Sequence, residues 1–182
     1  KEKDKPVVVI HTTNVKKQPN GKALVQGFWN ELIHDNHNLL FVQLGTKDKT
    51  LRGDADMNLT VQKNYLDCRG QFTIRQAALL VKNSLFHVTV DSVIQHLSYW
   101  AQKPGIVIFG SSSPAMQGHS HNTNIWDDRE CSPCVDNIRN QNCCQIRGIN
   151  HVTVPEINTI IRKKFFDGKQ RKKVESGWKI EE

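Results

Sequence analysis

The chain has 182 residues, which is the size of one ordinary domain and long enough to bury a single hydrophobic core. No apolar run approaches the roughly 20 residues of a membrane-spanning helix, and no apolar segment follows the charged start as in a secretion signal. The net charge of +7 suits a polyanion, a membrane surface or a phosphorylated small molecule as ligand. Because the chain begins with Lys, we expect a processed or excised piece of a longer, soluble protein.

Two βαβ units are predicted, and the first opens the chain. Pro6–His11 is an apolar run typical of a strand buried on both faces, and Leu39–Leu44 is a second one. Between them, the apolar residues of Leu24–Ile33 recur at helical spacing. A polar loop with hydroxyl and ammonium groups follows the first strand, at Thr12, Thr13, Lys16 and Lys17.

A polar, charged segment, Gly45–Asp56, comes next and is expected to be a surface loop. Leu59–Val61 is predicted as a short strand. A helix should then begin after Thr73, which is expected to cap its amino terminus. Its predicted buried face consists of Ile74, Ala77, Ala78 and Val81.

The second βαβ unit spans Phe86–Pro114. Phe86–Val90 and Ile106–Phe109 are predicted strands, and Ser92–Ala101 between them has helical spacing and ends before Pro104. Successive units of this kind need right-handed crossovers, which place helices on both faces of a parallel sheet. The sequence therefore predicts an α/β fold, Rossmann-like, with a mostly parallel sheet.

Polar side chains leave both strands of this second unit at the same edge of the sheet. Asp91, Ser92 and His96 follow its first strand, at a helix amino terminus whose free N–H groups attract anions. Ser111 and Ser112 follow its second strand. Each residue alone has an ordinary explanation, since Ser92 or Asp91 could cap the helix and His96 could pack. Together they predict a site for a phosphorylated ligand.

The carboxyl-terminal part contains one further predicted helix, Val154–Phe166, with Pro155 near its first turn. We place the domain at residues 1–166 and expect residues 167–182 to be a basic, extended or mobile tail. Solvation alone explains a tail of this composition, although it could also lie against anionic lipid.

Four cysteines form a dense group, with a C-x-x-C pair followed by two adjacent thiols, at Cys131, Cys134, Cys143 and Cys144. This spacing is typical of tetrahedral zinc or iron, although adjacent side chains project in different directions. Three states stay open: a bound metal, a disulfide or free thiols.

The segments VTVDSVIQHLSYW and KPGIVIFG resemble glycosyltransferase family 9, the lipopolysaccharide heptosyltransferase family. The resemblance implies one half of a two-domain, B-type glycosyltransferase, namely the carboxyl-terminal Rossmann-like domain that binds the nucleotide sugar. The chain departs from the family pattern at Val93, where glycine is usual. Glycine lets backbone approach a phosphate closely, so Val93 implies weaker binding.

The resemblance also implies which residues hold the nucleotide sugar. Family members bind the donor diphosphate with small or hydroxyl residues and a lysine after the first strand, which here are Thr12, Thr13 and Lys16 or Lys17. Phe72 and Thr73 match the segment that contacts the nucleoside, although Phe72 alone would be read as a core residue. Many members carry a C-x-P-C segment with further cysteines, which favours structural zinc or iron at the cysteine group.

The implied reaction is transfer of a heptose or similar hexose from a nucleoside diphosphate to a glycan or lipid-linked acceptor. It would serve lipopolysaccharide biosynthesis in the cytoplasm or at the inner face of the membrane. Lys16 or Lys17, Ser92, His96 and the helix amino terminus would stabilise the leaving diphosphate, and Asp91 would orient His96 or bind donor hydroxyls. No catalytic residue is assigned, because the family supplies the general base from an amino-terminal, acceptor-binding domain. We therefore expect this chain alone to be inactive.

Two other functions stay open. A sugar-nucleotide epimerase-like domain would also place phosphate at helix termini. A basic nucleic-acid-binding module would need aromatic residues among its lysines, and the tail offers only Trp178, so we expect no nucleic-acid partner. The sequence contains no G-x-G-x-x-G fingerprint, which argues against a redox dinucleotide.

Overall fold

The computed structural model describes residues 4–12, 24–47, 58–110, 112–126 and 152–167. The chain divides into two compact units, residues 1–151 and 152–182. The first unit contains the sheet and the candidate site, and the second contains the carboxyl-terminal helix. The predicted boundary at residue 166 stays a prediction.

Six parallel strands form one sheet in the order β3-β2-β1-β4-β5-β6. They are β1 (Val7–His11), β2 (Leu40–Gln43), β3 (Tyr65–Asp67), β4 (Phe86–Val90), β5 (Ile106–Ile108) and β6 (Thr123–Ile125). The chain proceeds outward from β1 to β3, returns to β4 beside β1, and then proceeds outward in the other direction. This is the strand order of Rossmann sheets, so the predicted fold class is confirmed.

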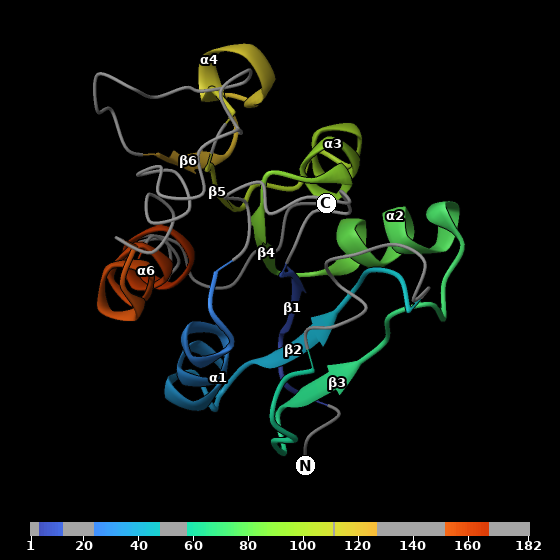
Figure 1. Cartoon of the computed structure of the whole chain (residues 1–182), viewed down its shortest axis with the longest axis vertical. Coiled ribbons are helices and arrows are strands. Elements are labelled where there is room, and N and C mark those ends of the chain that lie inside the picture. The colour runs from blue at the N-terminus through green and yellow to red at the C-terminus, as the bar shows by residue number, and fades with distance from the viewer. Residues whose placement is uncertain (1–3, 13–23, 48–57, 111, 127–151, 168–182) are drawn as a thin grey trace, which may run out of the picture. The chain divides into compact units, whose positions relative to one another are not determined.

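Helices connect the strands and cover both faces of the sheet, as Figure 1 shows. They are α1 (Gln26–Asp35) between β1 and β2, α2 (Ile74–Asn83) before β4, α3 (Val93–Trp100) between β4 and β5, and the short α4 (Pro114–Gln117) before β6. In Figure 1, α2 and α3 lie next to each other on one side of β1 and β4, and α1 lies on the other side. Right-handed crossovers require this arrangement, because the strand order reverses at β1.

The hydrophobic core under α2 and α3 joins these helices to β1 and β2, through Val9, Val42, Leu44, Ala77, Val81 and Ile94. Every residue of β4 is buried, as expected for a central strand with both faces covered. The apolar stripe of α1 is buried as well, at Phe28, Trp29, Leu32 and Ile33. On α2, Ala77, Ala78 and Val81 are buried as predicted, but the prediction is wrong for Ile74, which is exposed in the first turn.

Two edge strands differ from the prediction. The predicted strand at Leu59–Val61 is wrong, because β3 lies at Tyr65–Asp67 instead. The strand β6 was not predicted at all. Each has only three residues, which is too short for a pattern of its own, so hydrogen bonds from the neighbouring strand decide its position.

The predicted helix ends are mostly confirmed. Thr73 caps α2 in a full capping box with Gln76, and α3 ends at Trp100, before Pro104. The suggested capping role of Ser92 is wrong, because its side chain makes no capping hydrogen bond to α3. The Ser92 hydroxyl is buried instead.

In the second unit, α6 (Val154–Ile161) begins with a capping box formed by Thr153 and Glu156. It continues as the π-helix η3 (Arg162–Asp167), so the helix predicted over Val154–Phe166 is confirmed. Among the residues that the structure describes, no helix has the length and apolar character needed to cross a membrane.

Candidate functional site

A cavity of about 300 Å³ lies at the carboxyl edge of the sheet. Its walls come from the ends of β1, β2 and β3 and from the first turns of α2 and α3. The lining residues are His11, Leu44, Gly45, Thr46, Cys68, Phe72, Ile74, Ala77, Val93 and Ile94. Because His11 ends β1 and Val93 follows β4, the cavity lies where the strand order reverses, the usual ligand position in open α/β sheets.

Three apolar residues form an open rim on this cavity. Phe72, Ile74 and Val93 line it and are 43%, 57% and 49% exposed. Phe72 is therefore a surface residue of the cavity and not a core residue. The neighbouring Thr73 is exposed and engaged in the capping box of α2.

Asp91 connects the exits of β4 and β5. Its side chain is buried, and its carboxylate accepts hydrogen bonds from Gln95 Nε2 and from Ser112 Oγ. The sequence predicted that these two exits would lie together, and this bond joins them. The carboxylate thus holds the first turn of α3 against the segment after β5.

His96 lies on the exposed face of α3 and meets a loop that the sequence analysis did not connect to it. Its Nδ1 is 2.9 Å from Nε2 of His119. Tyr99 stacks on the His119 ring with a centroid distance of 4.3 Å. Burial, and after it the neighbouring His96 and His121, lower the pKa of His119.

Thr12, at the exit of β1, belongs to a buried polar group. Its Oγ1 accepts a hydrogen bond from Gln43 Nε2 at 3.0 Å, and the Tyr65 hydroxyl donates to Gln43 Oε1. Burial, and to a lesser extent the carboxylate of Asp67, raises the pKa of Tyr65 to about 12. The preceding residue, His11, lines the cavity.

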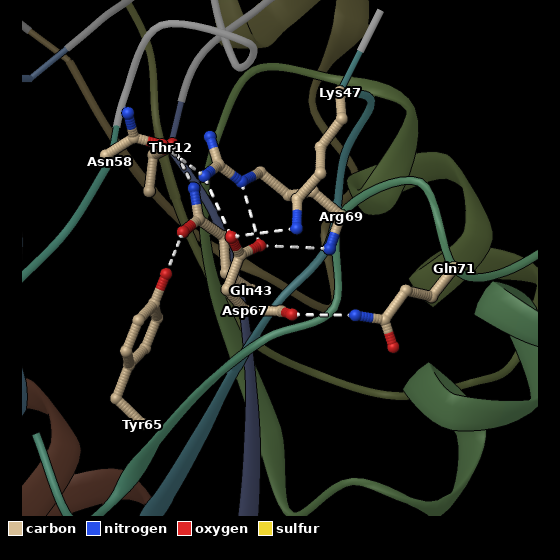
Figure 2. A network of polar contacts seen from close by, with 8 residues as sticks. All are labelled: Thr12, Gln43, Lys47, Asn58, Tyr65, Asp67, Arg69 and Gln71. Atoms are coloured by element: carbon tan, nitrogen blue, oxygen red, sulfur yellow. Dashed lines mark hydrogen bonds and ion pairs between the residues drawn. The ribbon is translucent and has the colours of Figure 1, made fainter. Parts of the chain in front are cut away.

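Figure 2 shows a second polar group beside the first, centred on Asp67 and Arg69. Arg69 is only 2% exposed, and its guanidinium donates from Nε to Asp67 Oδ1 at 2.9 Å and from Nη2 to Oδ2 at 3.0 Å. Lys47 Nζ lies 3.3 Å from Oδ2. These hydrogen bonds, with that from Arg69 the strongest influence, lower the pKa of Asp67 to about 2. A carboxylate at a strand end, two residues before an arginine, was the signal that could have identified this pair.

Several predicted site residues lie outside the described part of the chain, so their roles stay predictions. They are Thr13, Lys16, Lys17, Ser111, Cys131, Cys134, Cys143 and Cys144. Within the described part, no group of three or more histidine, cysteine or acidic side chains is placed to hold a metal ion.

Residues 3–144 match the model of glycosyltransferase family 9 (heptosyltransferase). No curated protein matches the chain in sequence.

Several solved structures share the fold. The iron-containing, dodecameric heptosyltransferase TibC in complex with ADP-D-β-D-heptose is 17% identical, with a TM-score of 0.67, over 88% of this chain and 45% of TibC. TibC comes from enterotoxigenic E. coli. The ADP-heptose lps heptosyltransferase II of E. coli is 18% identical, with a TM-score of 0.63, over 88% of this chain and 48% of the enzyme. A glycosyl transferase family 9 protein of Veillonella parvula gives a TM-score of 0.62 at 12% identity, over 88% of this chain and 46% of that protein. The chain thus spans slightly less than half the length of these proteins.

Proposed function

Because the chain belongs to glycosyltransferase family 9, we propose that it is the nucleotide-sugar-binding part of a transferase. That transferase would move a heptose or a similar hexose from a nucleoside diphosphate to a glycan or a lipid-linked acceptor. The observation that carries this proposal is the cavity at the point where the strand order reverses. Open Rossmann-like sheets bind nucleotides at this point. The complex of TibC with ADP-D-β-D-heptose, which has the same fold, supports the choice of donor.

The apolar rim at the start of α2 suits the nucleoside end of such a donor. Phe72 and Ile74 are partly exposed, so they can pack on a flat base and still gain from its burial. The diphosphate would then reach the loop after β1, where Lys16 or Lys17 supplies a compact cation.

The three predicted residues around α3 take different parts in the proposal. His96 is exposed and can donate to a phosphate oxygen. Ser92 has a buried hydroxyl without a hydrogen-bond partner among the described residues, next to the amino terminus of α3. Asp91 is a positioning residue, because its carboxylate already accepts hydrogen bonds from Gln95 and Ser112.

In this proposal the chain stabilises the charge that develops on the departing diphosphate, through lysine, His96 and the amino terminus of α3. The acceptor and the general base belong to an amino-terminal domain, in keeping with a chain that spans less than half of its solved relatives. The chain alone therefore binds a nucleotide weakly and transfers no sugar. A cytoplasmic location and contact of the basic tail with anionic lipid remain predictions.

Calorimetric titration of the whole chain with ADP, UDP and GDP, and with their sugars, tests the proposal. Ile74→Asp should abolish binding, because a carboxylate on the apolar rim would have to lose its water to let the base pack there. Leu79→Asp is the matched control, since Leu79 is on the same helix and 53% exposed but does not line the cavity. Binding of no nucleotide, or equal binding by both variants, contradicts the cavity as the donor site. Sugar transfer by the chain alone contradicts the division between two domains.

Val93 offers a test in the opposite direction. It is the first residue of α3, and its side chain lines the cavity at the helix end that would receive phosphate. Val93→Gly should strengthen the binding of ADP but not of adenosine, because only the phosphates gain access to the amide groups. Val61→Gly, at a 90% exposed loop position, controls for added backbone freedom. Unchanged ADP affinity in Val93→Gly would place the phosphates elsewhere.

The cysteine group fits iron or zinc by its chemistry, since thiolates are preferred ligands of both. We assign it a structural iron, supported by the iron-containing TibC of the same fold. Cys131, Cys134 and one or both of Cys143 and Cys144 would hold the metal. Elemental analysis of protein purified without chelator should find about one metal per chain, and Cys131→Ser should remove it. Disulfides or free thiols without metal would contradict this assignment.

A further inference from the structure

The carboxyl ends of β1, β2 and β3 share one pattern. At each end, one polar residue belongs to the polar groups drawn in Figure 2, and the residue next to it lines the cavity. The pairs are Thr12 with His11, Gln43 with Leu44, and Asp67 with Cys68. Because successive side chains of a strand point to opposite faces, the polar groups lie directly behind the cavity wall.

Two loops of this wall are bound to each other through their backbones. Cys68 N–H donates to the carbonyl of Gln43 at 3.0 Å, and Gly70 N–H donates to that of Gly45 at 2.8 Å. Gly45 and Cys68 both line the cavity. A change in the separation of these loops would therefore change the width of the cavity.

The side chains of Asp67 and Arg69 hold the same loops from behind. The Asp67 carboxylate accepts two side-chain hydrogen bonds and one backbone hydrogen bond from Arg69, at 2.9 to 3.1 Å. Arg69 Nη2 also donates to Asn58 Oδ1 at 2.9 Å, and Lys47 of the other loop forms an ion pair with Asp67. Gln71 donates to the backbone carbonyl of Asp67 at 2.9 Å, next to Phe72 of the rim.

An ion pair with a buried guanidinium is a poor source of stability. Removing its charges from water costs several kcal/mol per ion, and apolar residues of similar size often stabilise a protein as well or better. A bidentate pair fixes orientation, because the planar guanidinium of arginine holds the carboxylate in one position. The pair is therefore suited to keeping a cavity wall in place.

We propose that Asp67 and Arg69 are positioning residues for nucleotide binding, which rests on the proposed function. The ion pair sets the spacing between the loops after β2 and β3, so that the cavity has the width of a nucleobase before the ligand arrives. Neither residue contacts the donor.

The test compares ADP affinity and local hydrogen exchange in the whole chain. Asp67→Asn and Arg69→Lys should each weaken ADP binding about tenfold, because each leaves the wall misplaced. Arg69→Lys keeps the positive charge but lacks the planar guanidinium. If this variant also loses affinity, the guanidinium geometry and not the charge alone is required. The amides of Cys68 and Gly70 should exchange faster in both variants.

Asn122→Ala provides the control for a merely destabilised protein. Asn122 is buried beside β5 and accepts a hydrogen bond from Gly105 N–H, far in sequence from the cavity wall. It should lower stability but leave both ADP affinity and the exchange of Cys68 and Gly70 unchanged. If the wild type binds ADP and the Asp67→Asn and Arg69→Lys variants bind it with the same affinity, the positioning role is wrong. Absence of any nucleotide binding by the wild type contradicts the proposed function itself.

Discussion

The two halves of the sheet use polar groups differently. Behind the ends of β1, β2 and β3, a buried guanidinium and a partly exposed ammonium surround the carboxylate of Asp67. At the ends of β4 and β5, the buried carboxylate of Asp91 accepts hydrogen bonds from a neutral amide and a neutral hydroxyl. We refer to the first as the charged side and to the second as the neutral side.

The neutral side also contains a buried histidine. His87 is fully buried in β4, and its Nε2 lies 3.2 Å from Asn122 Oδ1, which also accepts the Gly105 N–H at 3.0 Å. Since Asn122 Oδ1 only accepts, His87 Nε2–H donates to it, and burial favours the neutral form of the ring by lowering its pKa. The comparison indicates that close packing holds the side chains of the neutral side in place. On the charged side, oriented charges next to the cavity do so. Changes of volume and of charge should therefore affect the two sides differently.

The largest expected effect is on the packing of the neutral side. A Cβ at position 105 would lie 2.3 Å from two atoms of the His87 ring, so Gly105→Ala should lower the free energy of unfolding by about 3 kcal/mol or more. Urea denaturation measures this loss. Gly27→Ala is the control, because nothing lies within 4 Å of a Cβ there and the residue is in α1. It should instead gain about 0.5 to 1 kcal/mol from the lower backbone entropy of alanine. If Gly105→Ala unfolds with the same free energy as the wild type, the His87 ring does not pack against Gly105.

The second prediction concerns acid sensitivity of the same side. Burial lowers the pKa of His87 from 6.5 to about 4. Between these values the unfolded chain binds a proton and the folded chain does not, so stability falls as the pH falls from 6.5 to 4. The loss from this residue is roughly 3 kcal/mol. Urea midpoints between pH 4 and pH 7 should show it, and His87→Gln should remove this part of the pH dependence. An identical pH profile in the variant would mean that His87 is accessible to protons.

The third prediction compares the two carboxylates directly. Asp67→Asn should lower the free energy of unfolding by about 2 kcal/mol, because the buried Arg69 loses its counter-charge. Asp91→Asn should cost about 1 kcal/mol, since the two described side chains that donate to it, Gln95 and Ser112, are neutral. Asp67 also contributes stability above pH 3.8 that is lost as the pH falls towards 2, because its pKa is lowered to about 2. Urea denaturation at pH 7 gives both differences, and the reverse order would contradict the division into charged and neutral sides.

The smallest expected effect is at the start of α2, where the cavity rim begins. Thr73→Ala removes one half of the capping box and should lower the free energy of unfolding by about 1 kcal/mol. Arg75→Ala, at an exposed position in the same turn, should change stability little. Equal losses in the two variants would show that the box contributes nothing specific.

Local sequence patterns predicted the elements that bury large apolar surfaces. β1, β2, β4 and β5 are rich in β-branched, aromatic and other apolar residues, and α1 and α2 carry apolar stripes, so these six elements lie close to where they were expected. The short strands β3 and β6 were misplaced or missed, because sequences such as YLD and TNI gain their pairing from a neighbour. The two βαβ units also predicted that polar residues would gather at one edge, and the bond between Asp91 and Ser112 joins two of these exits.

The candidate site itself was only partly predictable. Phe72 was identified beforehand and lines the cavity, whereas at the start of α3 the lining residues are Val93 and Ile94 and not the predicted Asp91, Ser92 and His96. Arg69, Lys47 and Cys68 were not identified, because the strand that ends at Asp67 was expected at Leu59–Val61, so no strand end was looked for beside them. The strand order 3-2-1-4-5-6 brings the ends of β2 and β3 together.

The amino-acid sequence was enough to predict the alternation of the main strands and helices, the family, and the chemical types of residue at the ends of β1, β4 and β5. These follow from local propensity and from short motifs, which act over a few neighbouring residues. The tertiary structure alone decided that Thr12 and Asp91 are buried, that a cavity opens beside them, and that an ion pair lies behind its wall. The physical reason is that burial and hydrogen-bond partners come from segments distant in sequence, and only the order in which the strands pair brings those segments into contact.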